Sequence, residues 1–357
     1  MKKLVFSACA LTLTGSVALA NDSDWAQLDK DVQALSASLQ DVEGTGVTIG
    51  GRIRVFYDNS GDIQPNGPAG NDLGGFTAYN ARLYAHGTTS AGVGYRLEND
   101  FATGNLLDAF VDVNLATDIN LRIGQFRGFV LNESQIDSGN LFFADRSQIA
   151  RTFAGRGTGA AVTGNFDAFE FGVTIQNGGD GVGDDLFYAI RGGIAILGEG
   201  TQLVEGAYGA GDEMEASAGI AFFSDDAVDD ADGIALEATL ASSMFSLQAA
   251  VLSLGDVAIT STNEINEVGV IPLEGDTTPW SIGGTFMLTD GTSDYGAWEL
   301  GARFQDLDDS ISTRLIDIGA NYYADGHNMK YTIGWTQIDV DGDADVSLFR
   351  LGVNTRF

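Results

Sequence analysis

The sequence predicts an all-β chain whose antiparallel strands close into a transmembrane barrel, and three observations support this. Apolar and polar residues alternate over many short segments, which is the pattern of strands with one apolar and one polar face. Glycine is abundant, with 48 residues, whereas proline occurs only 4 times, as expected for many strands joined by tight turns. The chain also ends on an aromatic residue directly after an amphipathic segment.

The C-terminal segment, residues 347–357, reads S-L-F-R-L-G-V-N-T-R-F, in which Phe349, Leu351, Val353 and Phe357 share one face with Thr355. In a soluble sheet, a final strand of this kind would expose an apolar face and an unpaired edge, which promotes aggregation. In a closed barrel no edge is free, and the apolar face contacts acyl chains. A soluble β-sandwich fits the composition as well, so it stays an alternative on these grounds.

The N-terminus has the pattern of a secretory signal peptide. Lys2 and Lys3 precede an apolar stretch that ends in Ala18-Leu19-Ala20, which predicts a signal peptide over residues 1–20. A single membrane anchor is disfavoured, because the apolar stretch is short and rich in Ala and Ser. Cys9 is the sole cysteine and would leave with this peptide, so we expect no disulfide and no thiol chemistry in the mature chain.

Residues 21–44 carry a different pattern, in which apolar residues recur at alternating spacings of three and four. They are Trp25, Leu28, Val32, Leu35, Leu39 and Val42. This spacing is the a/d seam of a coiled coil, and it favours a periplasmic heptad helix that associates between subunits. A single amphipathic helix packed on one end of the barrel would look similar. Three heptads are marginal alone, but barrels that already associate would hold the helices close together.

Residues 45–357 form the predicted barrel, in which alternation indicates sixteen strands. An even number with both chain ends on the periplasmic side is typical of a single-chain bacterial barrel. The stretch 195–215 is ambiguous and could change the count. The expected strands lie near residues 47–57, 79–86, 93–101, 107–115, 119–126, 158–164, 169–176, 186–194, 216–223, 233–241, 244–252, 278–288, 297–305, 312–323, 329–338 and 347–357.

The connections between these strands differ in length at the two ends of the barrel. One end has short turns, such as residues 87–91 and 116–118, whereas the other end has the long polar connections 58–75, 127–157 and 253–277. Short periplasmic turns and long extracellular loops are the pattern of membrane barrels. A soluble sandwich has no reason to segregate its loops in this way, so this asymmetry favours the barrel.

The charge of the chain excludes one class of partner. Asp and Glu number 50 against 18 Lys and Arg, which gives a formal net charge of −32. Nucleic-acid binding requires a positive surface, so we expect none. Acidic surfaces of this kind attract cations and stay soluble in salt.

Enzymatic and metal chemistry find little support in the sequence. The two histidines, His86 and His327, have no nucleophile and carboxylate at a recognisable spacing, so we expect neither enzymatic activity nor a cofactor. A run of four alternate aspartates is a weak candidate for calcium, but its spacing is not that of an EF-hand loop. A solvated acidic loop without a bound metal is the favoured interpretation of this run, Asp339, Asp341, Asp343 and Asp345.

Several stretches between Ala81 and Gly164 form a recognisable combination. They read A-R-L-Y-A-H-G, Y-R-L-E-N-D-F, L-L-D-A-F-V-D, L-R-I-G-Q-F-R-G-F and G-R-G-T-G-A-A-V-T-G. In combination they resemble the phosphate-selective porin O and P family. The resemblance implies a trimeric, 16-stranded channel in the outer membrane of a Gram-negative bacterium, with a loop folded into its lumen. The connection 127–157 is the natural candidate for that loop.

The resemblance implies a porin, and the charge pattern suggests how this porin differs from its family. The family carries phosphate along arginines and lysines, whereas here only Lys30 and Lys330 follow the signal peptide. We therefore expect passive diffusion of ions and small hydrophilic solutes, weakly selective or cation-leaning at low salt. The alternatives are a phosphate- or anion-selective channel, as in the family, and a non-conducting structural or adhesive barrel. Expected partners are outer-membrane lipid and lipopolysaccharide, further copies in a homotrimer, and the barrel-assembly machinery, for which Phe357 would act as the signal.

Side chains that face the lumen would form the functional surface. Arginine is a fixed cation suited to oxyanions, and rings of charge in a narrow pore set its ion preference. Seven of the arginines fall between residues 82 and 156, opposite an acidic face of the loop. Alternatively, these charges pair to hold loop and wall together. The candidate channel-lining and constriction residues are Arg52, Arg54, Arg82, Arg96, Arg122, Arg127, Arg146, Arg151, Arg156, Glu98, Asp108, Asp112, Glu133 and Asp137.

Overall fold

A computed structural model describes residues 46–61, 73–179, 181, 183–199, 203–211, 213–227, 231–256, 271–289, 296–342 and 345–357. The expected signal peptide and the expected heptad helix, from Trp25 to Val42, lie outside these described residues. Of the helices described, none is long and apolar enough to cross a membrane.

Sixteen strands and two short helices make up the described part of the chain. The helices are α2 (Asn132–Gln135) and α3 (Gln148–Thr152). The strands are β1 (Val47–Gly61), β2 (Leu73–Thr88), β3 (Gly94–Asp100), β4 (Asn105–Ala116), β5 (Ile119–Arg127), β6 (Arg156–Phe166), β7 (Phe169–Asn177), β8 (Leu186–Leu197), β9 (Glu215–Asp225), β10 (Ala231–Ala241), β11 (Phe245–Leu254), β12 (Trp280–Met287), β13 (Ala297–Asp306), β14 (Arg314–Asp325), β15 (Met329–Asp339) and β16 (Val346–Arg356).

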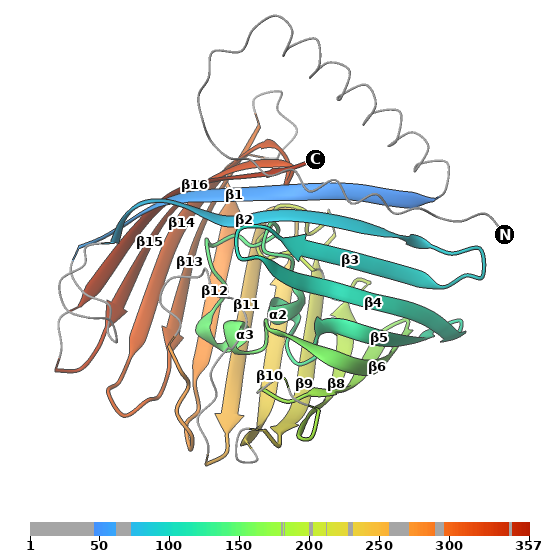
Figure 1. Cartoon of the computed structure of the whole chain (residues 1–357). Helices are drawn as coiled ribbons and strands as arrows, with labels where there is room; N and C mark the ends of the chain where they lie inside the picture. Colours follow the sequence, from blue (N-terminus) through green and yellow to red (C-terminus); the bar gives the residue numbers. More distant parts are fainter. Residues whose placement is uncertain are drawn as a thin grey trace, which may run out of the picture. The chain divides into compact units, whose positions relative to one another are not determined.

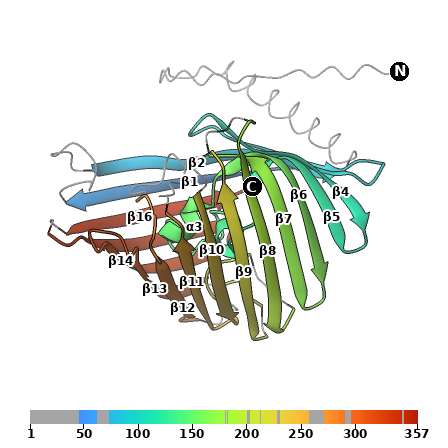
Figure 2. The same ribbon diagram turned by 90° about the horizontal axis from the view of Figure 1, so that it is seen from below.

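The strands follow one another around a closed antiparallel barrel, in which β16 returns to β1 (Figures 1 and 2). At this closure Arg52 lies opposite Arg356 and Arg54 opposite Asn354. Two backbone hydrogen bonds join Gly51 to the last residue, Phe357, at N···O distances of 2.9 and 3.2 Å. A Cβ at Gly51 would lie 2.4 Å from the Phe357 ring, so glycine makes room for the aromatic end of the chain where the barrel seals.

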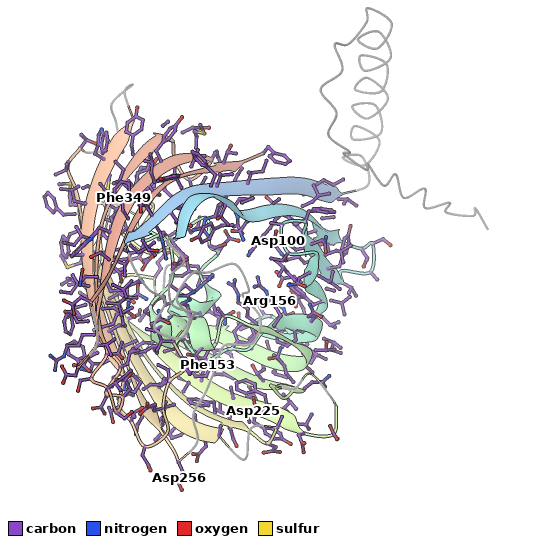
Figure 3. All side chains as sticks on the ribbon, turned by 60° about the vertical axis from the view of Figure 1, so that its left-hand side comes forward. Asp100, Phe153, Arg156, Asp225, Asp256 and Phe349 are labelled. Atoms are coloured by element: carbon purple, nitrogen blue, oxygen red, sulfur yellow. The ribbon has the colours of Figure 1, made fainter. Side chains whose placement is uncertain are left out.

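The two faces of the barrel wall differ as the alternation predicts. On β15 the outward side chains Tyr331 and Ile333 are exposed, whereas the inward Lys330 and Thr332 are buried. The closing strand β16, where Figure 3 labels Phe349, repeats this pattern with exposed Phe349 and buried Arg350. A surface of exposed apolar side chains on an all-antiparallel closed barrel is a lipid-facing surface.

Aromatic side chains form a row on the outer surface near one end of this wall. Trp298, Tyr322 and Tyr331 lie directly opposite one another on β13, β14 and β15. Their ring centroids are 5.0 Å apart for Trp298 and Tyr322, and 6.1 Å for Tyr322 and Tyr331. Tyrosine and tryptophan prefer the membrane–water interface, so this row is placed as an interfacial girdle would be.

The predicted sixteen-stranded barrel is confirmed, and the sandwich alternative is wrong because the sheet closes on itself. The described residues of the ambiguous stretch 195–215 form no additional strand: β8 ends at Leu197 and β9 begins at Glu215. The connection between them is therefore long although it lies at the end of the barrel that has short turns. Strands β1 and β2 also extend further than expected, so the first long connection is shorter than the predicted 58–75.

Candidate functional site

The connection between β5 and β6, residues 128–155, lies inside the barrel with α2 and α3, and we call it the inner loop (Figure 1). Its apolar side chains, among them Leu131, Ile136 and Ile149, are almost completely buried. Ser147 caps α3, because its Oγ accepts a hydrogen bond from the backbone N–H of Ala150 at 3.2 Å. The inner loop is thus a packed element with its own apolar contacts.

Charged and polar side chains fasten the inner loop to the wall formed by β13–β16 and β1. Arg52 pairs with Asp137, Arg350 pairs with Asp145, and the Arg303 guanidinium lies 3.4 Å from Glu133. Acidic groups of the loop therefore meet cations of the wall directly. In this part of the lumen the charges hold loop and wall together.

A second segment enters the lumen from the opposite end. Residues 203–211, which we call the β8–β9 segment, belong to the connection that leaves β8, and β8 runs antiparallel to the strand that leads into the inner loop. The Glu205 carboxylate accepts hydrogen bonds from the backbone N–H groups of Phe142 and Phe143 at 2.8 and 3.2 Å. It also lies 3.2 Å from Arg303. The two segments therefore meet inside the barrel.

The far end of the β8–β9 segment is fixed by equally specific contacts. The Ala207 N–H donates to Glu299 at 2.6 Å and to the Thr285 hydroxyl at 2.9 Å. The Tyr208 ring stacks on the inward ring of Tyr323 with centroids 4.0 Å apart. The segment is held against β12, β13 and β14, on the same side of the lumen as the inner loop.

Burial changes the acidity of two carboxyl groups in these segments. Burial raises the pKa of Glu205 to about 7; Arg303 opposes this rise and Glu133 reinforces it. Burial alone would also raise the pKa of Asp145, but Arg350 and the neighbouring Arg151 outweigh it and lower that pKa below its ordinary value. Asp145 is therefore a firm anionic anchor, whereas Glu205 titrates near neutral pH.

A cavity of about 940 Å³ remains on the side of β3–β8, and Arg156 lies in this interior in Figure 3. We call it the passage. It is bounded by the wall on one side and by the inner loop on the other. The charged side chains that line it are Arg96, Arg122, Arg127, Arg156, Arg191, Glu98, Asp108, Asp118, Asp137 and Glu170.

Cations and carboxylates pair along the passage. Arg122 donates two hydrogen bonds to Asp112, at 2.8 and 2.9 Å. Asp108 lies between two arginines, 3.2 Å from Arg96 and 3.3 Å from Arg156. The passage therefore has a mixed-charge wall, whose arginines are largely compensated by acidic neighbours.

The other predicted residues hold the structure together. Arg82 is buried, 2.8 Å from Asp100 and 3.5 Å from Glu98. Arg54 hydrogen-bonds the Ala144 carbonyl of the inner loop, while Arg146 and Arg151 are buried within that loop. Glu133 accepts hydrogen bonds from the N–H and hydroxyl of Ser147, at 2.6 and 2.7 Å.

Two further predictions concern the chain end and the acidic run. Phe357 is 70% exposed at the end of β16. Within the described ranges no group of three or more His, Cys, Asp or Glu could hold a metal ion, and Asp343 lies outside those ranges.

Sequence reasoning missed Glu205 and three phenylalanines around Arg122. Glu205 sits in the ambiguous stretch, where no period signalled an inward segment. Phe110 and Phe126 share the inward face of their strands with Asp108 and Arg122, so an aromatic residue at a polar position of the alternation was the available signal.

Comparisons with known proteins agree with this architecture. The family described as phosphate-selective porin O and P matches residues 47–254. OprB of Pseudomonas putida at high pH is similar in structure, with 9% identity, a TM-score of 0.60, and coverage of 90% of this chain and 97% of that one. OmpF of Salmonella typhi in complex with daunomycin gives 14% identity, a TM-score of 0.58, and coverage of 88% and 98%.

The anion-selective porin of Comamonas acidovorans gives 14% identity, a TM-score of 0.55, and coverage of 87% of this chain and 99% of that one. Identities this low show the fold alone, and no curated protein sequence matches the chain. The match to the family spans more than half of the chain, and the family and fold are those of channels. The chain belongs to the phosphate-selective porin O and P family and forms a channel for ions and small solutes in the outer membrane of a Gram-negative bacterium.

Proposed function

We propose that the chain is a general diffusion porin whose route is the passage between β3–β8 and the inner loop. The observation that carries this proposal is the pairing of charge along the passage. Arg96, Arg122 and Arg156 each hydrogen-bond a carboxylate. A solute anion that enters would meet a carboxylate beside each of these cations, so the net field is small. Weak ion selectivity follows.

The inner loop forms the proposed constriction. Asp137 lines the passage from the inner loop, while Asp108, Arg127 and Arg156 line it from the wall. The net charge of −32 over the whole chain adds a general attraction for cations, which salt screens. The selectivity is therefore expected to lean toward cations at low salt and to fade at high salt.

The reversal potential of the purified protein in a planar bilayer under a KCl gradient tests this proposal. We expect a small potential of the sign of cation preference at low salt. Strong anion preference with block by phosphate would contradict it and favour the phosphate-selective alternative of the family. Absence of current would favour a non-conducting barrel.

The proposal includes a homotrimer in lipid and lipopolysaccharide, inserted by the barrel-assembly machinery, and no catalytic activity. The heptad pattern of residues 21–44 supports association between subunits. The exposed Phe357 at the end of β16 supports a role as an assembly signal. Deleting Phe357 should impair insertion, and deleting residues 21–44 should weaken the trimer on a native gel. Normal insertion, or an unchanged trimer, would contradict the respective role.

A further inference from the structure

Three phenylalanine rings surround Arg122 on the wall of the passage. The Arg122 guanidinium carbon lies 3.8 Å from the ring centroid of Phe110 on β4, 5.8 Å from that of Phe126 on β5, and 5.9 Å from that of Phe129 in the inner loop. All four side chains line the 940 Å³ cavity. The interior of an aqueous barrel is normally polar, so this aromatic surface needs an explanation.

Glycines allow close packing around these residues. Gly124 lies opposite Phe110 in the pairing of β4 and β5, and a Cβ there would meet the β4 backbone, 2.2 Å from the Ala109 carbonyl oxygen and 2.7 Å from the Phe110 Cα. A Cβ at Gly172 would lie 3.1 Å from the Phe129 Cβ. Phe126 is buried, whereas Phe110 and Phe129 are partly exposed. The Phe126 ring packs between them, with centroids 6.4 Å from Phe110 and 6.3 Å from Phe129, so the three rings form one aromatic wall of the passage.

Polar groups border this aromatic surface. Arg122 and Asp112 are about a quarter exposed, at 26% and 27% of their side chains. Arg122 uses two of its five N–H donors in hydrogen bonds to Asp112. The Asn120 amide donates to Asp112 at 3.2 Å, while its buried Oδ1 has no hydrogen-bond partner among the described residues. Arg122 therefore keeps N–H donors available beside the rings, whereas the buried Asn120 Oδ1 is out of reach of a solute.

The charges along the passage indicate which class of solute would bind at this aromatic surface. The five arginines and five carboxylates that line the passage compensate one another, so the site gives no strong preference for an ion. A flat apolar face favours a solute with C–H groups on one side. Guanidinium N–H donors beside it favour hydroxyl oxygens as acceptors. A sugar ring has both features.

We propose that Phe110, Phe129 and Arg122 form a subsite for a carbohydrate ring along the diffusion route. This subsite deepens the proposed function and rests on the passage being that route. A sugar ring stacks its C–H face on Phe129 and on the part of Phe110 that Arg122 leaves exposed, and its hydroxyl oxygens accept hydrogen bonds from Arg122.

Block of the channel current by maltotriose tests the subsite. Wild-type protein should show a saturable decrease in current. Phe129→Ala and Phe110→Leu should each raise the half-blocking concentration by roughly fivefold, the scale of one lost aromatic contact. Phe169→Ala is the matched control, because Phe169 on β7 is an exposed phenylalanine of the outer surface and its loss should change nothing.

The outcomes separate the subsite from the channel. Saturation-transfer NMR can follow sugar binding to the detergent-solubilised protein without any measurement of current. Binding without conduction would contradict the proposed diffusion route but not the subsite. Conduction without saturable maltotriose block or binding would overturn the subsite alone. Block by benzoate but not by maltotriose would also overturn it, since the rings would then serve an aromatic anion.

Discussion

The two sides of the lumen carry similar residues and use them differently. Along β3–β8 Arg122 lines an open passage, and the side chains of Arg122 and its partner Asp112 are 26% and 27% exposed. On the side of β13–β16, Arg303 of β13 and its partner Glu205 of the β8–β9 segment are only 5% and 6% exposed, because this segment and the inner loop pack against the wall. The alternation of the sequence therefore predicts which side chains point inward, but not whether they contact water or other parts of the protein.

The difference has energetic consequences. A partly exposed ion pair is screened by solvent and contributes little to stability. Removing one partner of a buried pair leaves a charge without compensation, which is costly. The covered side should therefore control whether the two inner segments stay in place, and the open side should control which solutes pass.

The largest expected effect comes from Arg303→Met. Arg303 is the shared cation of Glu133, Glu205 and Asp317, at 3.4, 3.2 and 2.9 Å. Its loss should destabilise the protein by about 3–5 kcal/mol, measured by urea unfolding in detergent micelles. Arg122→Met is the control on the open side and should cost about 1 kcal/mol or less. Equal losses in the free energy of unfolding for the two variants would show that the two sides of the lumen do not differ in this way.

The second effect depends on pH through Glu205. Its raised pKa, about 7, means that the folded protein favours the neutral carboxyl. That stabilisation is complete below the ordinary value near 4.5 and is lost as pH rises through about 7. Ionised Glu205 then lies beside Glu133, with Arg303 as the cation of both, and Glu299 contacts the same segment.

We therefore expect more current fluctuation at pH 8 than at pH 5, as contacts between the inner loop and the β8–β9 segment loosen. Glu205→Gln should remove this pH dependence while keeping the volume of the side chain. If the fluctuations of the Gln variant still depended on pH, a group other than Glu205 would be responsible for that dependence.

The smallest effect should come from Asp108→Asn on the open side. Asp108 compensates both Arg96 and Arg156, so its neutralisation should shift the permeability ratio toward anions by roughly twofold to fivefold, the scale of one partly screened charge. Asp306→Asn removes the partner of the exposed Arg314 outside the passage and serves as the control. An equal shift in both variants would show that the charge of the whole chain, and not the passage, sets selectivity.

Much of the fold was predictable because side chains of a strand alternate between its two faces, and this alternation is visible in the sequence. The inward positions of Arg52, Arg303 and Arg350 and the pairing of β16 with β1 follow from alternation and closure. The β8–β9 segment was not predictable, because its apolar residues resemble a strand while Gly206 and Gly209 adopt positive φ values of 105° and 88°. The side chains of such a backbone follow no period, and its partners are up to 119 residues away along the chain.

Cysteine accessibility can show whether water reaches the wall at β6 but not at β15. The background is simple to prepare, since Cys9 is the only cysteine of the chain. In a Cys9→Ser background, Thr163→Cys places a thiol on β6 at the passage, and Thr332→Cys places one on β15 beneath the inner loop. A charged methanethiosulfonate reagent should reduce the current quickly in the Thr163 variant and leave the Thr332 variant almost unchanged. Equal rates in the two variants would show that water fills both sides of the lumen and would contradict the account.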